Sequence, residues 1–404
     1  MKKLLPFVWI FISASTYAQH NVSPNQVDYE LGKGLTFDFD NQNYRFRLGG
    51  FIQPRYSYSK VEEASAENQL YINRARFSLS GLAVKEKVGF MLQTDFTLSN
   101  PLLDAWISYQ PTKQLRIAAG QKRSPLNNRE MMINEDKFQF TDRSELSRSF
   151  TETGREFGLF LDGRYTLGAV GIAPQVALTS GDGRNSFGAN SRDADKGGIK
   201  YGGRLDVYPL GYFSAGNDAY FADLSHEEAP KFVIGVAGSV NKGASHQTGE
   251  GHGSFQLFNA DQREQYPDYR KIYADLLLKY RGFSFLGEYA NSSVTGLQGL
   301  YTNAATTALL QPQQISTYLI LGNAFNVQSG YVTKSGYSLD VRYTMLRPEF
   351  PDRTDGLLAD TKAYTIGLSK YMKGNDLKIQ TALSRIERQA TKDVKAEVIL
   401  QLVF

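Results

Sequence analysis

Alternation between apolar and polar residues, repeated from about residue 44 almost to the end of the 404-residue chain, is the feature that most restricts its fold. In the stretch YINRARFSLSG, Ala75, Phe77 and Leu79 fall on one face of an extended chain. Arg74 and Arg76 fall on the other face. A period of two residues is typical of a β-strand with one apolar side. The sequence therefore predicts an all-β protein.

The connections between these segments alternate in length, which separates a barrel from a sandwich. About 14 to 16 segments can be counted, and short turns such as MKGND and YRGF alternate with long polar stretches. The long stretches are residues 124–153, 180–200, 241–268 and 291–314. A β-sandwich has shorter and more even spacing. One short side and one long side predict a transmembrane antiparallel β-barrel of about 16 strands, with periplasmic turns and extracellular loops.

The physical chemistry of lipid supports the same fold. Beyond the N-terminal region no apolar run approaches about 18 residues, so membrane helices are not expected. Lipid offers no hydrogen-bond partners, and a sheet in a membrane must therefore close on itself. The last segment, AEVILQLVF, has one apolar face that ends on Phe404. A terminal aromatic residue of this kind is similar to the signal that directs bacterial barrel proteins into the outer membrane.

The N-terminal region predicts export. Lys2 and Lys3 precede an apolar core, and Thr16-Tyr17-Ala18 is a suitable cleavage site, so residues 1–18 are predicted to be a signal peptide. Residues 19–43 are then a periplasmic N-terminal lead, and residues 44–404 form the barrel domain. Removing the two lysines lowers the formal charge from +4 to +2. Such a small excess argues against binding to nucleic acid.

Catalysis, a metal and a cofactor are not predicted. The chain has no cysteine and only four histidines. His246 and His252 lie in the glycine-rich stretch HQTGEGHG, where a hydrophilic loop tip is favoured over a metal site. No Ser/His/Asp grouping falls regularly at strand ends. We therefore expect a protein without enzymatic activity.

Arginines on the first two strands are the first candidate functional residues. Arg55, Arg74 and Arg76 lie on the face opposite the apolar residues. A charge on the lipid face costs about 2–4 kcal/mol at the membrane midplane, so these side chains are predicted to face the lumen. One interpretation is a cationic wall that attracts anions, and guanidinium groups suit oxyanions well. The other is general lumen polarity, balanced by acids such as Asp95, Asp104 and Glu156.

The stretch GQKRSPLNNREM, which leaves a strand and enters a connection of about 30 residues, is the second candidate. A barrel of 16 strands is wide enough for an aqueous channel, and selectivity then requires a loop that folds inward. Lys122, Arg123 and Arg129 would bring positive charge to that constriction. An ordinary external loop is the alternative interpretation.

These stretches, in this order, resemble the phosphate-selective porin O/P family of bacterial outer membranes. The similarity covers essentially the whole mature sequence and is carried by GLTFDFDNQNYRFRLGGFIQPRY, RARFSLSG, LLDAWISYQP, GQKRSPLNNRE and TGREFGLFLDGRY. It implies a trimeric porin of 16 strands with a narrow, anion-favouring constriction. The residues that it implies for the constriction are Arg55, Arg74, Arg76, Lys122 and Arg123, with Asp104 as the acidic counterpart.

The sequence thus predicts a passive diffusion channel of the bacterial outer membrane, with a cationic constriction that favours small anions such as phosphate. Its expected partners are outer-membrane lipid, small anions and two further copies of the chain in a homotrimer. The alternative is a barrel that serves mainly as a structural or partner-binding component of a larger assembly.

Overall fold

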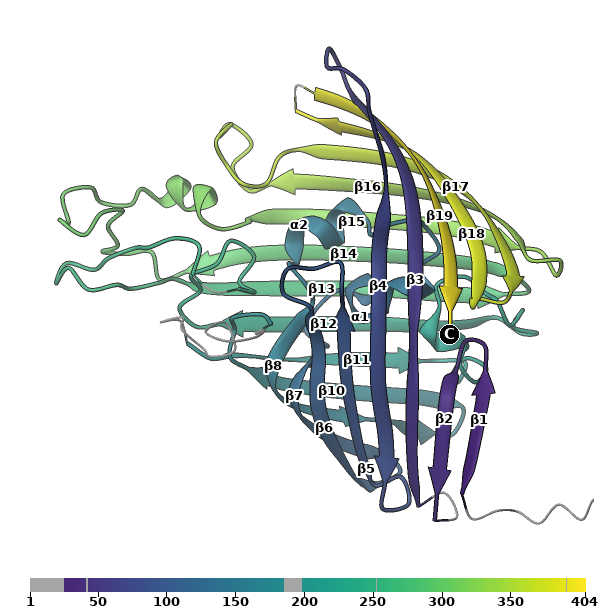
Figure 1. Cartoon of the computed structure of the whole chain (residues 1–404). Coiled ribbons are helices and arrows are strands. Elements are labelled where there is room, and N and C mark those ends of the chain that lie inside the picture. The colour runs from purple at the N-terminus through teal and green to yellow at the C-terminus, as the bar shows by residue number, and fades with distance from the viewer. Residues whose placement is uncertain (1–24, 41–42, 185–197, 252, 390) are drawn as a thin grey trace, which may run out of the picture.

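The computed structural model describes residues 25–40, 43–184, 198–251, 253–389 and 391–404, and the predicted signal peptide lies outside these ranges. The chain forms one closed antiparallel barrel of 16 strands (Figure 1), as the sequence predicted. The strands are β3 (Tyr44–Val61), β4 (Glu67–Ala83), β5 (Val88–Asp95), β6 (Leu102–Thr112), β7 (Leu115–Arg123), β8 (Arg155–Gly163), β10 (Val170–Thr179), β11 (Lys200–Tyr208), β12 (Lys231–Asn241), β13 (Asp268–Tyr280), β14 (Phe283–Thr295), β15 (Gly322–Val332), β16 (Tyr337–Pro348), β17 (Thr361–Lys373), β18 (Leu377–Arg388) and β19 (Thr391–Val403).

Three short strands complete the sheet. The strand β9 (Tyr165–Leu167) continues the line of β8 and also pairs with β10. The strands β1 (Gln26–Glu30) and β2 (Gly34–Phe39) form a hairpin, and β2 pairs with the first residues of β3. Part of the predicted N-terminal lead is therefore ordered as sheet beside the barrel.

The barrel closes where its last strand meets its first. The strand β19 pairs antiparallel with β3, so that Ile399 lies opposite Arg55 and Val403 opposite Phe51. Phe404 extends this seam by one residue, because its backbone N–H donates to the carbonyl of Gly50 at 2.9 Å. The N–H of Gly50 in turn donates to the carbonyl of Phe404 at 2.8 Å. No edge of the barrel wall is left unpaired at this position, as a membrane requires.

Removing Phe404 should lower the yield of folded barrel, since it removes both hydrogen bonds at the seam and an aromatic side chain. Heat-modifiable migration in denaturing gels measures the folded fraction. The variant Phe404→Tyr keeps the backbone pair and the ring, and it should fold as the parent does. Equal folded yields for the parent and the truncated chain would contradict this role.

The two faces of the wall differ in polarity. Large apolar side chains are exposed on the outside, such as Ile272, Leu339 and Leu368, each more than half exposed. The alternate residues point inward and are often charged, such as Asp275 and Lys279 on β13. Apolar atoms outward and charges inward are what a lipid environment demands of a barrel. Among the helices in the described ranges, none has the length and the apolar character needed to span a membrane.

In the described ranges, five short helices lie in the connections. They are α1 (Arg129–Met132), η1 (Glu135–Lys137), α2 (Glu145–Phe150), η3 (Asn217–Ala219) and η4 (Pro312–Thr317). The first three belong to the connection between β7 and β8, and α1 and α2 lie within the outline of the barrel (Figure 1). The apolar stretch 315–327 comprises the end of η4, a buried turn and the first part of β15.

The predicted difference between the two ends of the barrel holds for most connections, although β3 to β4, β5 to β6 and β18 to β19 are joined by short turns at the end predicted to carry long loops. The connections from β13 to β14, β15 to β16 and β17 to β18 are short turns at the same end, which we call the turn side. Residues 209–230, between β11 and β12, also belong to this end but form a long segment. Its Phe213 and Phe221 are buried, which shows that the segment packs against other parts of the molecule and is not a free loop.

Candidate functional site

Residues 124–154, here named the constriction loop, fold into the barrel as the sequence predicted. The loop begins after β7 and reaches strands on the far side of the lumen. Arg129 donates to Asp275 on β13 at 2.6 Å and to Asp206 on β11 at 2.7 Å. Asn128 donates to Glu288 on β14 at 3.0 Å. These bonds, made between buried groups, fix the first part of the loop across the lumen.

Apolar packing fixes the rest of the loop against the inner face of the wall. Leu146 and Phe150 of α2 are completely buried, in a cluster that includes Tyr273 and Ala290 of the wall. Phe138 belongs to a second cluster with residues of β12, β13, β14 and the 209–230 segment. Side chains of the loop therefore occupy the lumen beside β13 and β14. The larger cavities of the lumen lie along β3 to β11, and a small cavity of about 30 Å³ lies between the loop and β16 to β19.

The three arginines predicted from the first strands are brought together beneath the loop. Arg76 binds Asp95 at 3.0 Å and also pairs with Glu135 of the loop. Arg55 and Arg74 both approach Asp142 of the loop, at 3.2 and 3.5 Å.

Two of these arginines are withdrawn from open water. Arg55 is 2% exposed and also pairs with Glu397 of β19, and Arg76 is 5% exposed. Each of them is surrounded by carboxylates. In this position they attach the constriction loop to the wall, and little of their charge is presented to the lumen.

Glu135 is the centre of the loop attachment and was not singled out in the sequence. Its carboxylate accepts from Arg123 at 2.6 Å and from Arg143 at 2.7 Å, besides pairing with Arg76. Burial opposes its ionisation, but Arg123, Arg76 and Arg143 hold the pKa of Glu135 well below its usual range. The carboxylate is therefore charged at neutral pH. The sequence could have indicated this role, because an acidic residue in a loop that folds onto a cationic wall can attach the loop to that wall by ion pairs.

The remaining predicted residues lie apart from this attachment. Lys122 pairs with Asp162 of β8 at 3.2 Å, and its ammonium lies 4.7 Å from the centre of the Phe160 ring. Asp104 binds Arg155 at 2.9 Å and makes no contact with the arginines of β3 and β4 in the described part of the chain. Arg155, which the sequence interpretation did not select, is thus the partner of the predicted acid.

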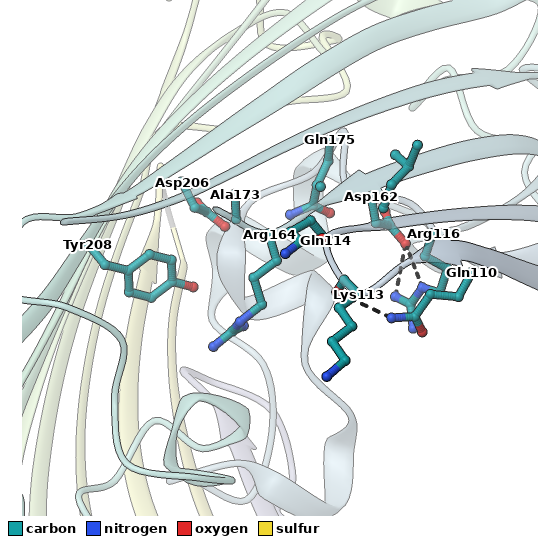
Figure 2. A pocket seen from close by; sticks show the side chains of 12 residues that line it. Gln110, Lys113, Gln114, Arg116, Asp162, Arg164, Ala173, Gln175, Asp206 and Tyr208 are labelled. Carbon is teal, nitrogen blue, oxygen red and sulfur yellow. Dashed lines mark hydrogen bonds and ion pairs between the residues drawn. The ribbon is translucent and has the colours of Figure 1, made fainter. Parts of the chain in front are cut away.

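Three connected cavities lead from the constriction loop to the turn side, and we call them together the vestibule. Their volumes are about 420, 340 and 210 Å³, and neighbouring cavities share lining residues such as Trp106, Arg116 and Tyr208. The largest lies directly against the loop, where Asn134 and Lys137 line it. Figure 2 shows the second cavity, with Arg116 held by Asp162 and with Arg164 near Tyr208.

Positive charge predominates in the lining of the vestibule. Its acidic side chains are Glu86, Asp104, Asp162, Asp206 and Asp218. Its cationic side chains are twice as numerous: Arg45, Arg47, Lys87, Lys113, Arg116, Lys122, Arg123, Arg129, Lys137 and Arg164. Within the described ranges, Arg47, Lys87, Lys113 and Lys137 form no ion pair within 4.0 Å. These four are the charges most available to a mobile ion.

Solved structures with the same barrel include three bacterial outer-membrane proteins. OmpF of Salmonella typhi, solved with daunomycin, is 12% identical over 90% of this chain and 99% of its own, with a TM-score of 0.55. DcaP of Acinetobacter baumannii, an outer membrane channel, is 12% identical over 90% and 98%, with a TM-score of 0.54. A loop-deletion mutant of Vibrio cholerae OmpT is 9% identical over 88% and 99%, with a TM-score of 0.51.

The fold is that of a bacterial porin. This fold, combined with an apolar exterior that suits a lipid environment, places the chain in a bacterial outer membrane. Neither a family model nor a curated protein sequence matches the chain. Its resemblance to phosphate-selective porins therefore stays a prediction from the sequence motifs.

Proposed function

We propose that this porin-fold barrel is a passive diffusion channel that favours small anions such as phosphate, and that it works as a homotrimer without enzymatic activity. The observation that carries the preference for anions is the twofold excess of cationic side chains in the lining of the vestibule. Rings and clusters of Arg and Lys lower the barrier for anions and raise it for cations.

The structure changes which residues we propose for contact with the anion. Arg55 and Arg76 are buried against carboxylates, and we assign to them the attachment of the constriction loop. Lys122 and Arg123 remain candidates, because both line the largest cavity beneath the loop. Lys137 joins them there, since its ammonium has no acidic partner among the described residues.

Exchanging two unpaired lysines of the vestibule should weaken anion preference. In planar bilayers with a KCl gradient, the reversal potential of the parent should report a higher permeability for chloride than for potassium. Replacing Lys113 and Lys137 by Gln should lower that permeability ratio by about threefold, because two uncompensated charges leave the lining. The matched control replaces Lys334 and Lys362 by Gln, two exposed lysines outside the lumen.

The control variant should keep the parental ratio, and an equal shift in both variants would refute the assignment. Block of chloride current by added phosphate tests the solute itself. A parent that gives no conductance steps at all would instead favour the alternative, a barrel with a structural or partner-binding role.

A further inference from the structure

A groove with a single cationic side chain lies on the outer surface of the barrel, at the turn side of β15 to β18. Its volume is about 480 Å³, and its main side chains are Tyr331, Tyr337, Leu339, Leu368 and Ile379, with Lys370 at one end. The apolar side chains face outward and are substantially exposed. The groove therefore opens to lipid and not to the lumen. The vestibule and the constriction loop have no part in it.

Lys370 is an unusual residue for this position. It is on the outward face of β17, in phase with Ile366 and Leu368, and its register partners are Tyr337 and Ile379. Its ammonium lies 3.8 Å from the centre of the Tyr337 ring and donates to the carbonyl of Ser335 at 2.6 Å.

The interactions of Lys370 leave part of its bonding capacity unused. An ammonium has three donors, and the structure assigns one of them to Ser335. The turn residue and the tyrosine ring hold the charge at the end of the groove, at the depth where tyrosines and lysines mark the boundary between hydrocarbon and headgroups.

We propose that the groove binds a glycerophospholipid of the periplasmic leaflet, with an acyl chain along Leu339 and Leu368 and the phosphate on Lys370. The apolar lining matches hydrocarbon, and the cation is placed where a headgroup phosphate lies. A second copy of the chain would bring a sheet with an apolar exterior of the same kind, which offers Lys370 no anion. Charge complementarity therefore favours lipid.

The test compares lipid binding to purified protein in detergent by native mass spectrometry. The probes are phosphatidylglycerol and a diacylglycerol with the same chains but no phosphate. Lys370→Gln should bind phosphatidylglycerol about fivefold more weakly than the parent, the effect expected for one lysine near a membrane surface. Lys362→Gln is the matched control, since it removes an exposed lysine from the other end of the same strand. Ile379→Trp, which fills the groove and keeps the charge, should also weaken binding.

Equal phosphatidylglycerol binding by the parent and Lys370→Gln, or equal binding of both lipids by the parent, would overturn the proposal. So would a change in oligomeric state in Lys370→Gln without any change in lipid binding, because a second copy would then be the occupant. Conductance and ion selectivity should be the same in all of these variants. Failure of this proposal is therefore distinguishable from failure of the proposed channel function.

Discussion

Deleting residues 127–134 from the constriction loop is expected to raise the single-channel conductance about twofold or more. The segment contains Asn128, Arg129 and Glu130, whose bonds to the far wall carry the loop across the lumen. Without them the loop loses its contacts with Asp275 and with Glu288. The shortened loop then retreats toward the wall from which it starts, and a larger cross-section is left for ions.

The deletion is best measured in concentrated KCl, where screening reduces the effect of changed charges and conductance reports mainly the open area. The matched control deletes residues 302–309, which are eight positions in the connection between β14 and β15, none of them buried. This control should conduct as the parent does. Parental conductance in the 127–134 deletion, with the barrel shown to be folded, would contradict a constriction at this loop.

The barrel wall could be predicted because lipid imposes a simple rule on it. On β4 and β19, apolar residues alternate with polar residues, and the structure turns the apolar side outward as expected. On β13 and β14 the alternation of apolar and polar residues is less regular. Tyr273, Leu277 and Leu286 face the lumen and are buried there by the constriction loop and its neighbours. Such strands carry apolar residues on both faces, and a sequence alone does not reveal what covers those of the inner face.

The candidate site could be predicted in part, for a related reason. Phase alone places Arg55, Arg74 and Arg76 in the lumen, and the structure agrees. Which acids meet them depends on the path of the loop, because Arg76 and Glu135 are 59 positions apart in the chain. The sequence named Asp95 among the balancing acids, and Asp95 does bind Arg76. The family resemblance implied Asp104 as the counterpart, whereas the loop supplies Glu135 and Asp142.

The 209–230 segment shows the same limit. The strand β11 stops at Tyr208, before Pro209, although the chain stays rich in apolar residues as far as Phe213. The segment then packs below the constriction loop, where the ammonium of Lys137 lies 5.5 Å from the centre of the Tyr220 ring. Nothing in the pattern of alternation marks a connection that turns inward at the turn side.

Replacing Glu135 by Gln is expected to raise the anion-to-cation permeability ratio on the order of fivefold. The change removes the one carboxylate on which Arg76, Arg123 and Arg143 converge, while the shape of the side chain is nearly kept. Arg76 retains Asp95, but Arg123 and Arg143 lose their only ionic partner among the described residues. Their charge then acts on the largest cavity of the vestibule, which Arg123 lines.

Asp136→Asn is the matched control. It removes one negative charge from the neighbouring position in the chain, and the carboxylate of Asp136 forms no ion pair among the described residues. Equal shifts in the two variants would mean that only the total charge matters. A loosened loop would show itself differently, as a rise in conductance like that of the 127–134 deletion.

The double variant Glu135→Gln with Arg143→Gln separates the remaining explanations. It restores the charge balance at this point of the loop, so the permeability ratio should return toward that of the parent. If the ratio stays high, Glu135 controls selectivity through the position of the loop and not through its charge. If the permeability ratio recovers and the conductance is unchanged, the balance of charge between Glu135 and its arginines determines the anion preference.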